Sequence, residues 1–380
     1  MAHPGDLDTT FGSGGKKTVN FGGTDAARVV LVQPNGRVVA AGGGGPASSF
    51  CVVRLRLANG TLDPTFGTGG KRVIDSGTDD ESVHGAALQP DGRIVLAGDS
   101  RLQPAVVRLK ANGALDTSFD GDGRKLFSWG PIGRVTAVVV APNGKILLGG
   151  FSGPEGGNIQ VARLNANGAL DTTFGAGGIA AVDFGATEFG EALARQADGR
   201  ILVAGRSSAT GAVVARLRAT GVLDPDFGSS GRVTLPGGGS VSAVLVQPDR
   251  NIVVAGNASG SATMTVTRLK PDGSLDATFG TAGTTAVAFG SLANPLGGAA
   301  RQPDGKIVIA GYTQDGEAVA VARLDASGSL DPSFGAGGKV TVDFGTATFG
   351  NAVALAPNGR IVVAGQKTGG DDFAVARLRG

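Results

Sequence analysis

The sequence predicts an all-β protein, a closed seven-bladed β-propeller with four antiparallel strands in each blade. A phrase of the form LDxxFGxxG recurs about every 50 residues, which is a period typical of repeat arrays. A second phrase, a tight turn followed by an apolar run such as QPDGRIVLAG from Gln89, recurs seven times in the same phase. No segment has helical periodicity over about ten residues. The copies of the first phrase begin at Leu7, Leu62, Leu115, Leu170, Leu223, Leu275 and Leu330.

One repeat, residues 82–127, shows how a blade is built. Pro90 and Gly92 form a tight turn, because proline presets φ and glycine allows a positive φ. The segments around this turn are short, apolar and rich in β-branched residues, which favours strands. Four such strands in about 50 residues match one propeller blade. The strands are expected at residues 83–88, 93–97, 105–109 and 124–127.

The two ends of the chain are predicted to close the ring together. The third strand of every repeat carries Arg-Leu, and in six repeats an LD aspartate follows it. Arg377 has no such aspartate after it, whereas Asp8 has no arginine before it. The N-terminal strand, residues 16–21, is therefore expected to complete the last blade, formed by residues 349–380. Closure of this kind leaves only short, protected strand edges.

The repeated residues are expected to build the scaffold. The leucine of LD and the following phenylalanine would fill the space between blades, and the aspartate would cap its turn through backbone N–H groups. The same aspartate can pair with the arginine of the third strand. The alternative, seven identical catalytic Asp/Arg pairs, is set aside. The phenylalanines are Phe11, Phe66, Phe119, Phe174, Phe227, Phe279 and Phe334.

Length and composition narrow the class of protein. The unbroken repeat predicts one propeller domain over residues 1–380, with residues 1–5 as a tail. The net charge is +2 and no Lys/Arg cluster stands out, so a nucleic-acid partner is not expected. Cys51 cannot form an internal disulfide, since it is the only cysteine, and it is expected to be a buried, inert thiol. No apolar stretch is long enough to cross a bilayer. We expect a monomer that does not insert into membranes.

The coupled phrases, LDxxFGxxG with turns such as PDGKIVIAG from Pro303, resemble the delta-60 repeat family, a β-propeller family without an agreed function. The resemblance covers nearly the whole chain and implies a bacterial protein located outside the cell or in the periplasm. It supplies no catalytic residues. The first residues, MAHPGDLD, lack the basic start and apolar run of a signal peptide. The turn and second strand are also similar to NHL and lactonase-type propellers, a likeness of fold alone.

Three local departures leave this blade count unchanged. Ala197 replaces the turn proline in the fourth repeat, Arg250 disrupts the turn in the fifth, and Asp120 replaces the glycine after Phe119.

Cofactor motifs are weak. The glycines of GSGGKK, from Gly12, lead into a strand, whereas a phosphate loop leads into a helix. Three acidic segments, at residues 119–123, 79–81 and 371–372, lack the ligand number and spacing of a calcium loop. No cofactor is expected, and calcium stays open as the weaker alternative.

The positions at which the repeats differ are the candidates for function. One column in the first strands reads Arg28, His84, Thr136, Glu191, Ser242, Gly297 and Asn351. A second column, after the second strands, reads Gly43, Asp99, Phe151, Arg206, Asn257, Tyr312 and Gln366. Since the first strand is innermost and the second runs back to the same face, both columns should meet at one mouth of the channel. The predicted ligand-binding residues are Arg28, His84, Asp99, Glu191, Arg206, Tyr312, Asn351 and Gln366, with Phe151 as a further apolar contact.

Two alternatives to this site remain open. The residues of a channel mouth can be polar simply because they contact solvent, without binding a ligand. In addition, Arg195 and Arg301 replace apolar residues lower on the first strands of blades four and six. These two arginines either line the channel and attract an anion or extend to the opposite opening.

Two functions compete for the same face. The first is a non-enzymatic binding or scaffold module that recognises a protein, a glycan or a small ligand. The second is a propeller enzyme, a lactonase-like hydrolase or a lyase, with Glu191 as acid or base and His84 as its partner. A metal there would need several converging carboxylates, Asn or His. The column offers few such metal ligands, and Arg28 would repel a cation. The sequence therefore favours the binding module over the enzyme.

Overall fold

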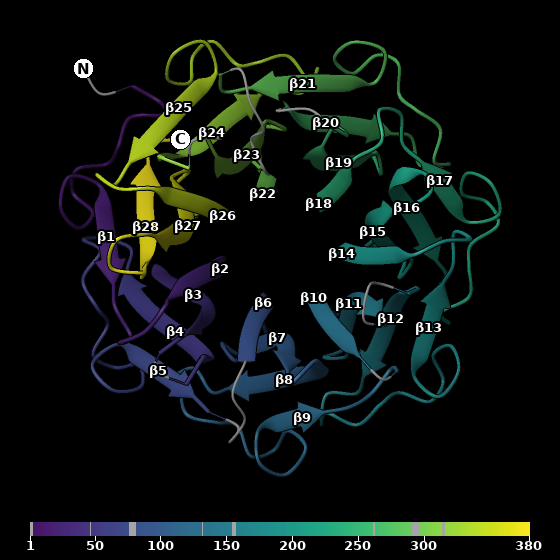
Figure 1. The fold of residues 1–380 in the computed structure, drawn as a ribbon, viewed down its shortest axis with the longest axis horizontal. Helices are drawn as coiled ribbons and strands as arrows, with labels where there is room; N and C mark the ends of the chain where they lie inside the picture. Colours follow the sequence, from purple (N-terminus) through teal and green to yellow (C-terminus); the bar gives the residue numbers. More distant parts are fainter. Residues whose placement is uncertain are drawn as a thin grey trace.

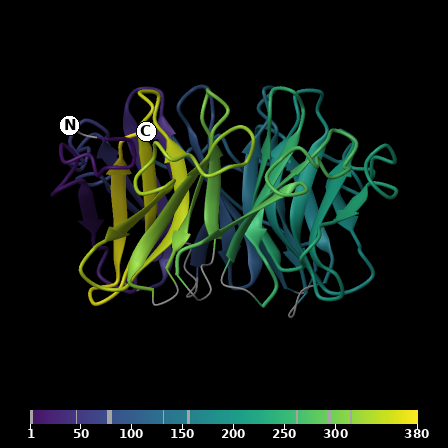
Figure 2. The ribbon, with the colours of Figure 1, turned by 90° about the horizontal axis from the view of Figure 1, so that it is seen from above.

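The computed structural model confirms the seven-bladed propeller. It describes residues 3–45, 47–75, 81–130, 132–153, 157–260, 263–290, 296–313 and 316–380. These residues form 28 strands in seven four-stranded antiparallel sheets and no helix. The sheets stand around a central opening, with the first strand of each blade innermost (Figure 1). Seen from the side, the molecule is a disc with the two chain ends at the same edge (Figure 2).

The blades follow the chain in order. Blade 1 contains β2 (Ala26–Gln33), β3 (Arg37–Gly44), β4 (Ser49–Arg56) and β5 (Lys71–Ile74). Blade 2 contains β6 (Glu81–Leu88), β7 (Ile94–Ser100), β8 (Gln103–Leu109) and β9 (Arg124–Leu126). Blade 3 contains β10 (Gly133–Val140), β11 (Ile146–Ser152), β12 (Ile159–Leu164) and β13 (Ile179–Val182). Blade 4 contains β14 (Glu188–Arg195), β15 (Ile201–Ser207), β16 (Gly211–Leu217) and β17 (Arg232–Thr234).

The remaining blades complete the ring. Blade 5 contains β18 (Ser240–Val246), β19 (Ile252–Asn257), β20 (Thr263–Leu269) and β21 (Thr284–Ala288). Blade 6 contains β22 (Leu296–Arg301), β23 (Ile307–Tyr312), β24 (Ala318–Leu324) and β25 (Lys339–Asp343). Blade 7 contains β26 (Thr348–Leu355), β27 (Ile361–Lys367), β28 (Asp372–Leu378) and the N-terminal β1 (Lys16–Val19).

The ring closes as predicted, by one N-terminal strand beside three C-terminal ones. β1 pairs antiparallel with β28, from Lys16 opposite Ala376 to Val19 opposite Phe373. The strand ends before Phe21, whose ring packs against Phe373 at 5.0 Å between centroids. Closure also uses residues expected to form a tail, because the carbonyl of Pro4 accepts a hydrogen bond of 2.9 Å from the N–H of Gly335.

A latch of three residues joins each blade to the next. In blade 3, Arg163 Nε lies 2.6 Å from Asp171 Oδ2, and the guanidinium lies 4.7 Å from the ring centroid of Phe174. The other oxygen of Asp171 accepts bonds from the N–H and hydroxyl of Thr173, at 3.2 and 2.7 Å. Arg163 also donates to the carbonyl of Ala219 in the next blade. The aspartate therefore both caps its turn and pairs with the arginine, as the sequence predicts.

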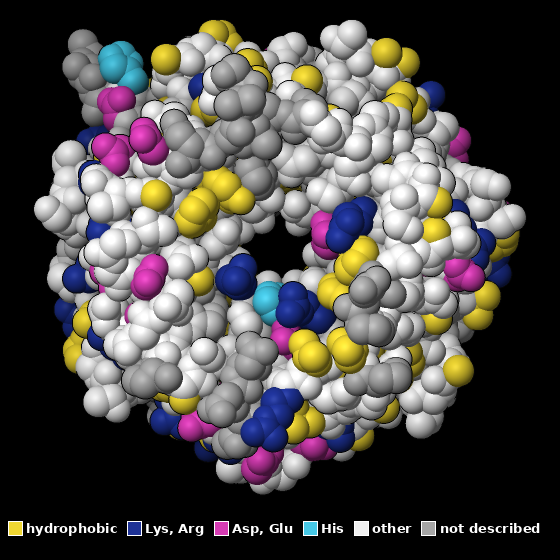
Figure 3. Space-filling view, viewed as in Figure 1, with side chains coloured by type: hydrophobic (Ala, Val, Ile, Leu, Met, Phe, Trp, Pro, Cys, Tyr) yellow, Lys and Arg dark blue, Asp and Glu magenta, His cyan; other side chains and the backbone are white. Residues whose placement is uncertain are grey.

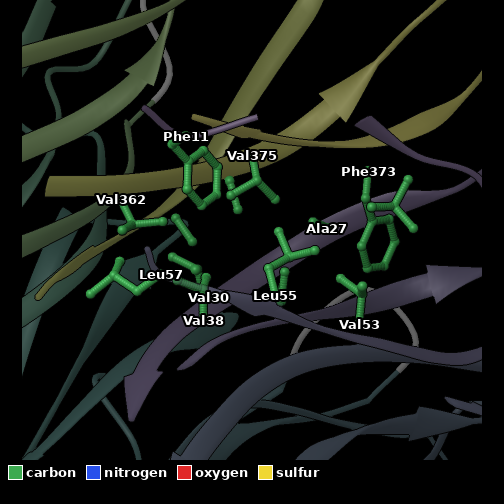
Figure 4. Packing of buried hydrophobic residues seen from close by; sticks show 14 of the residues in the cluster. Phe11, Ala27, Val30, Val38, Val53, Leu55, Leu57, Val362, Phe373 and Val375 are labelled. Carbon is green, nitrogen blue, oxygen red and sulfur yellow. The ribbon is translucent and has the colours of Figure 1, made fainter. Parts of the chain in front are cut away.

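The latch recurs in all seven blades. The shortest Arg–Asp contacts span 2.6 to 3.0 Å, and the guanidinium-to-phenylalanine distances span 4.6 to 5.0 Å. All seven phenylalanines are fully buried. Figure 4 shows Phe11 at the seam, packed with Leu55, Val362 and Val375 from blades 1 and 7. The core is thus a ring of clusters between blades, so that each blade depends on its neighbours.

Removal of residues 1–21 should lower the melting temperature and cause self-association. The deletion takes away β1 and the buried Phe11, and loss of one buried phenylalanine costs about 3–5 kcal/mol. It also exposes the edge of β28, which other chains can pair with. Differential scanning calorimetry and analytical ultracentrifugation measure both effects, with removal of residues 1–2 as the control. A monomer with an unchanged melting temperature would show that the seam is unimportant.

Replacement of Asp171 by Ala should destabilise the protein by about 1–2 kcal/mol without altering the channel mouth. Burial alone would raise the pKa of Asp171, but hydrogen bonds from Lys145, Thr173 and Arg163 outweigh it and hold the pKa far below its usual value. The ionised Asp171 therefore contributes fully to the free energy of unfolding above pH 3.8, and this contribution is lost as the pH falls below that value. Asp171→Asn keeps the side-chain oxygen that caps the turn, so it should lose less stability than Asp171→Ala. Urea titrations measure these differences, and a variant with native stability would contradict the latch.

Candidate functional site

Each innermost strand contains a β-bulge at the first variable column found in the sequence. The register of β2 against β3, for example, skips Arg28 between Ala27 and Val29. A bulge leaves one residue unpaired and re-aims its side chain. The seven bulge residues are Arg28, His84, Thr136, Glu191, Ser242, Gly297 and Asn351.

The second variable column lies at the same mouth of the channel. Asp99 is paired with Ser82, Arg206 with Phe189 and Gln366 with Phe349, all near the beginnings of the first strands. Figure 3 shows basic, acidic and histidine side chains gathered at the rim of the central opening. The mouth is thus a polar rim whose composition changes from blade to blade.

Blades 1 to 3 contribute a cluster around one carboxylate. Asp99 Oδ1 lies 2.6 Å from His84 Nε2 and 3.0 Å from Arg134 Nε, and the Asp99 side chain is 4% exposed. Burial lowers the pKa of His84, although the hydrogen bond and charge of Asp99 oppose this, so the imidazole is neutral at pH 7. Arg28 makes no hydrogen bond or ion pair with the residues that the structure describes. Partial desolvation at the mouth, together with the charge of Arg134, lowers the pKa of Arg28, although the charge of Asp99 opposes the shift.

Blade 4 contributes a second charged pair. Arg206 Nε lies 3.8 Å from Glu191 Oε1, and the guanidinium lies 4.0 Å from the ring centroid of Phe189. Phe189 in turn meets Phe151 edge-on at 5.0 Å. Burial raises the pKa of Glu191 to about 7, with Arg206 opposing the shift only in part. This carboxyl group therefore changes charge near neutral pH.

Two polar bulge residues hold neighbouring blades together. Asn351 Nδ2 donates to the carbonyl of Ala27 at 2.8 Å, and Thr136 Oγ1 donates to the carbonyl of Gly190 at 2.7 Å. Each accepting carbonyl directly precedes the bulge of the next blade. The Asn351 side chain, predicted as a ligand contact, therefore already has a structural hydrogen bond.

The rest of the predicted site lies on blades 6 and 7. Tyr312 packs edge-on against Phe349 at 4.9 Å, and burial raises the pKa of its hydroxyl. Gln366 is half-buried. The predicted residues thus form His84–Asp99, Glu191–Arg206 and an aromatic group, rather than one continuous cluster. Among the described contacts, His84 and Glu191 do not meet.

Sequence reasoning missed three residues of this rim, namely Arg134, Phe189 and Phe349. They share one position, two residues before the bulge, and they contact Asp99, Arg206 and Tyr312 respectively. The sequence signal that could have identified these residues is the variation from blade to blade at this position.

Arg195 and Arg301 lie at the opposite end of their strands and are half-buried. Neither forms an ion pair with a described residue, and Arg301 Nη1 donates to the carbonyl of Gln302 at 3.1 Å. Arg301 borders a hollow of about 400 Å³ at the opposite opening.

The described residues contain no group of three or more His, Cys, Asp or Glu side chains placed to hold a metal ion. Asp79 and Asp80 of the acidic segment lie outside the described residues. Burial raises the pKa of Cys51 to about 12, which keeps the thiol protonated. Within the described chain, no helix is long and apolar enough to cross a membrane.

The geometry defines a β-propeller with an asymmetric channel mouth. The chain belongs to the DUF5122 β-propeller family, described as a domain of unknown function, which matches residues 33–66, 89–119, 141–174, 196–227, 247–279, 302–334 and 356–379. Each match contains one turn phrase, and the first six also contain the following phenylalanine of the LD phrase. No curated protein matches the chain.

Solved structures share the architecture at low sequence identity. Virginiamycin B lyase from Staphylococcus aureus has a TM-score of 0.61 at 10% identity, covering 96% of this chain and 99% of its own. YCF48 bound to D1 peptide has a TM-score of 0.56 at 12% identity, covering 100% and 98%. An ulvan lyase of family PL25 has a TM-score of 0.53 at 12% identity, covering 96% of both chains. At these identities the likeness shows the fold alone.

Replacement of Glu191 by Gln should stabilise the protein above pH 7 and change little at pH 4. The folded state raises the pKa from 4.5 to about 7, so ionisation of Glu191 opposes folding. The stability penalty therefore grows as the pH rises from about 4.5 to about 7 and stays complete above that range. Melting temperatures of both proteins across this range measure the effect. Equal differences at pH 4 and pH 8 would contradict the raised pKa.

Proposed function

We propose that the chain is a binding module that holds a ligand at the channel mouth without transforming it. One observation supports this most strongly. The Arg–Asp–Phe latch between blades is repeated seven times, whereas the bulge side chains at the mouth differ in charge, size and polarity. A ring needs no such variation for its own assembly. Recognition of a specific ligand does need such variation, because the ligand must be oriented by side chains that differ around the ring.

The groups available to a ligand are few. Asp99 is already shared by His84 and Arg134, whereas Arg28 and Glu191 keep most of their capacity for new contacts. Phe151 offers apolar surface near the Glu191–Arg206 pair, and Tyr312 offers it on the other side of the mouth. A ligand that combines charged and apolar parts fits this rim, such as a protein segment, a glycan or a zwitterionic small molecule.

We place this function outside the cell or in the periplasm, on the resemblance of the repeats to the delta-60 family. We also propose that the protein acts as a monomer, since β1 covers the edge of β28 and closes the ring. Fractionation of the native host tests the location, and sedimentation velocity tests the monomer. A cytoplasmic pool or a stable dimer would contradict these two proposals.

A second candidate function is general-base catalysis by His84. The contact of 2.6 Å between His84 and Asp99 favours it, because a carboxylate orients a neutral imidazole for proton abstraction. This candidate requires that a bound ligand be converted. Product formation that disappears in His84→Asn, while binding persists, would establish an enzyme. A ligand recovered unchanged after prolonged incubation would contradict catalysis.

Replacement of both Glu191 and Tyr312 by Ala should weaken binding at least tenfold, a loss of ~1.4 kcal/mol, without lowering the melting temperature. Glycan and peptide arrays probed with the labelled protein identify a ligand, and titration calorimetry measures its affinity. The control replaces Lys17 and Val73 on the outer strands β1 and β5 by Ala. If the rim variant binds as tightly as the parent protein while the control loses affinity, the ligand binds the outer edges.

A further inference from the structure

We propose that Arg28, His84 and Arg134 form a carboxylate-binding subsite that receives a uronate group of an acidic saccharide. The inference rests on the proposed binding function and names the class of ligand.

Positive charge exceeds negative charge at the mouth over blades 1 to 3. Two guanidinium groups and one imidazole gather around a single carboxylate, Asp99, and a single oxygen of that carboxylate serves both His84 and Arg134. Arg28 makes no hydrogen bond or ion pair with a described residue, and burial and Arg134 together disfavour its charge more than Asp99 supports it. This excess of positive charge is relieved when a second carboxylate enters the mouth. The planar fork of arginine suits such a group, since it can donate two parallel hydrogen bonds.

The three side chains of the subsite come from three consecutive blades. Arg28 and His84 occupy the bulges of consecutive blades, and Arg134 lies two residues before the bulge of the third blade. Arg134 uses its Nε for Asp99, and its side chain is 41% exposed. Its terminal nitrogens therefore remain open to a ligand beside Arg28.

The tautomer of His84 leaves one of its ring nitrogens as a hydrogen-bond acceptor. An ionised Asp99 can only accept hydrogen bonds, so the neutral imidazole carries its proton on Nε2. The other nitrogen, Nδ1, is then an acceptor. A hydroxyl group can donate to Nδ1 while a neighbouring carboxylate meets the arginines. A uronate carries both groups on one ring, whereas sulfate or chloride offers no such donor.

Main-chain contacts between the blades favour a saccharide over an added peptide strand. The carbonyls of Ala27 and Gly190, which precede the bulges of blades 1 and 4, already accept hydrogen bonds from Asn351 and Thr136. Each carbonyl oxygen keeps a second lone pair, but a peptide main chain would have to share an oxygen that already joins two blades. Recognition at this part of the mouth therefore depends on side chains, which suits a sugar.

The test is an NMR titration of the intact protein with D-glucuronate, D-glucose and an acetylated dipeptide that has a free C-terminal carboxylate. The chain contains two histidines, His3 and His84, so the ring signals of His84 can be assigned with one variant. D-glucuronate should shift these signals at millimolar concentration, and the other two probes should shift them far less. Arg28→Gln should weaken the response to D-glucuronate at least tenfold and leave the melting temperature unchanged. The matched control, Arg232→Gln on the outer strand β17, should keep the full response.

Three outcomes would overturn the subsite. These are no shift with D-glucuronate, an equal shift with D-glucose, and an equal response in Arg28→Gln. An equal or larger shift with the dipeptide would overturn the assignment to a saccharide. If the arrays yield a neutral ligand that requires the rim, the binding function stands and the subsite fails. If no array ligand depends on the rim, the binding function itself fails.

Discussion

The ring depends on one interaction, the contact of an arginine with an aspartate and a phenylalanine at every junction between blades. The Arg163–Asp171 pair is representative, because Phe174 lies under the arginine and packs with residues of blades 3 and 4. The same arginine donates to a carbonyl of blade 4, so one side chain links a strand, a turn and the neighbouring blade. A blade cannot bury its own core alone. At the seam the contact is formed by Asp8, Phe11 and Arg377, which come from opposite ends of the chain.

Because the latch residues hold the blades together, the residues at the channel mouth can vary. The latch lies away from the bulges, so a change in a bulge side chain does not disturb the core between blades. Two bulges, at Thr136 and Asn351, nevertheless join their blades to the next by a hydrogen bond. The titratable bulge residues Arg28, His84 and Glu191 lie on blades 1, 2 and 4, which gathers the ionisable groups on one side of the mouth. The other side carries the aromatic pair of Tyr312 and Phe349.

Sequence reasoning could recover the parts of the fold that repeat. The blade count, the N-terminal strand in the last blade and both roles of the LD aspartate follow from phrases that recur in phase. The column of Arg28, His84 and Glu191 could be selected because its chemistry varies. The bulge at that column could not be predicted, since it is a shift in the pairing register of the first two strands that the alternation of residues does not reveal. Contacts such as Arg134 with Asp99 also lay beyond the sequence, because they depend on how the blades are placed beside one another.

Hydrogen exchange of the protein with and without its array ligand tests most directly whether repeated residues build the ring and variable residues bind. We expect new protection at the beginnings of the innermost strands, around residues 26–29, 82–85 and 188–191, with no change in the seven LDxxFG segments. Protection confined to the outer strands, such as β5 and β9, would contradict it, because the ligand would then bind where the blades are alike.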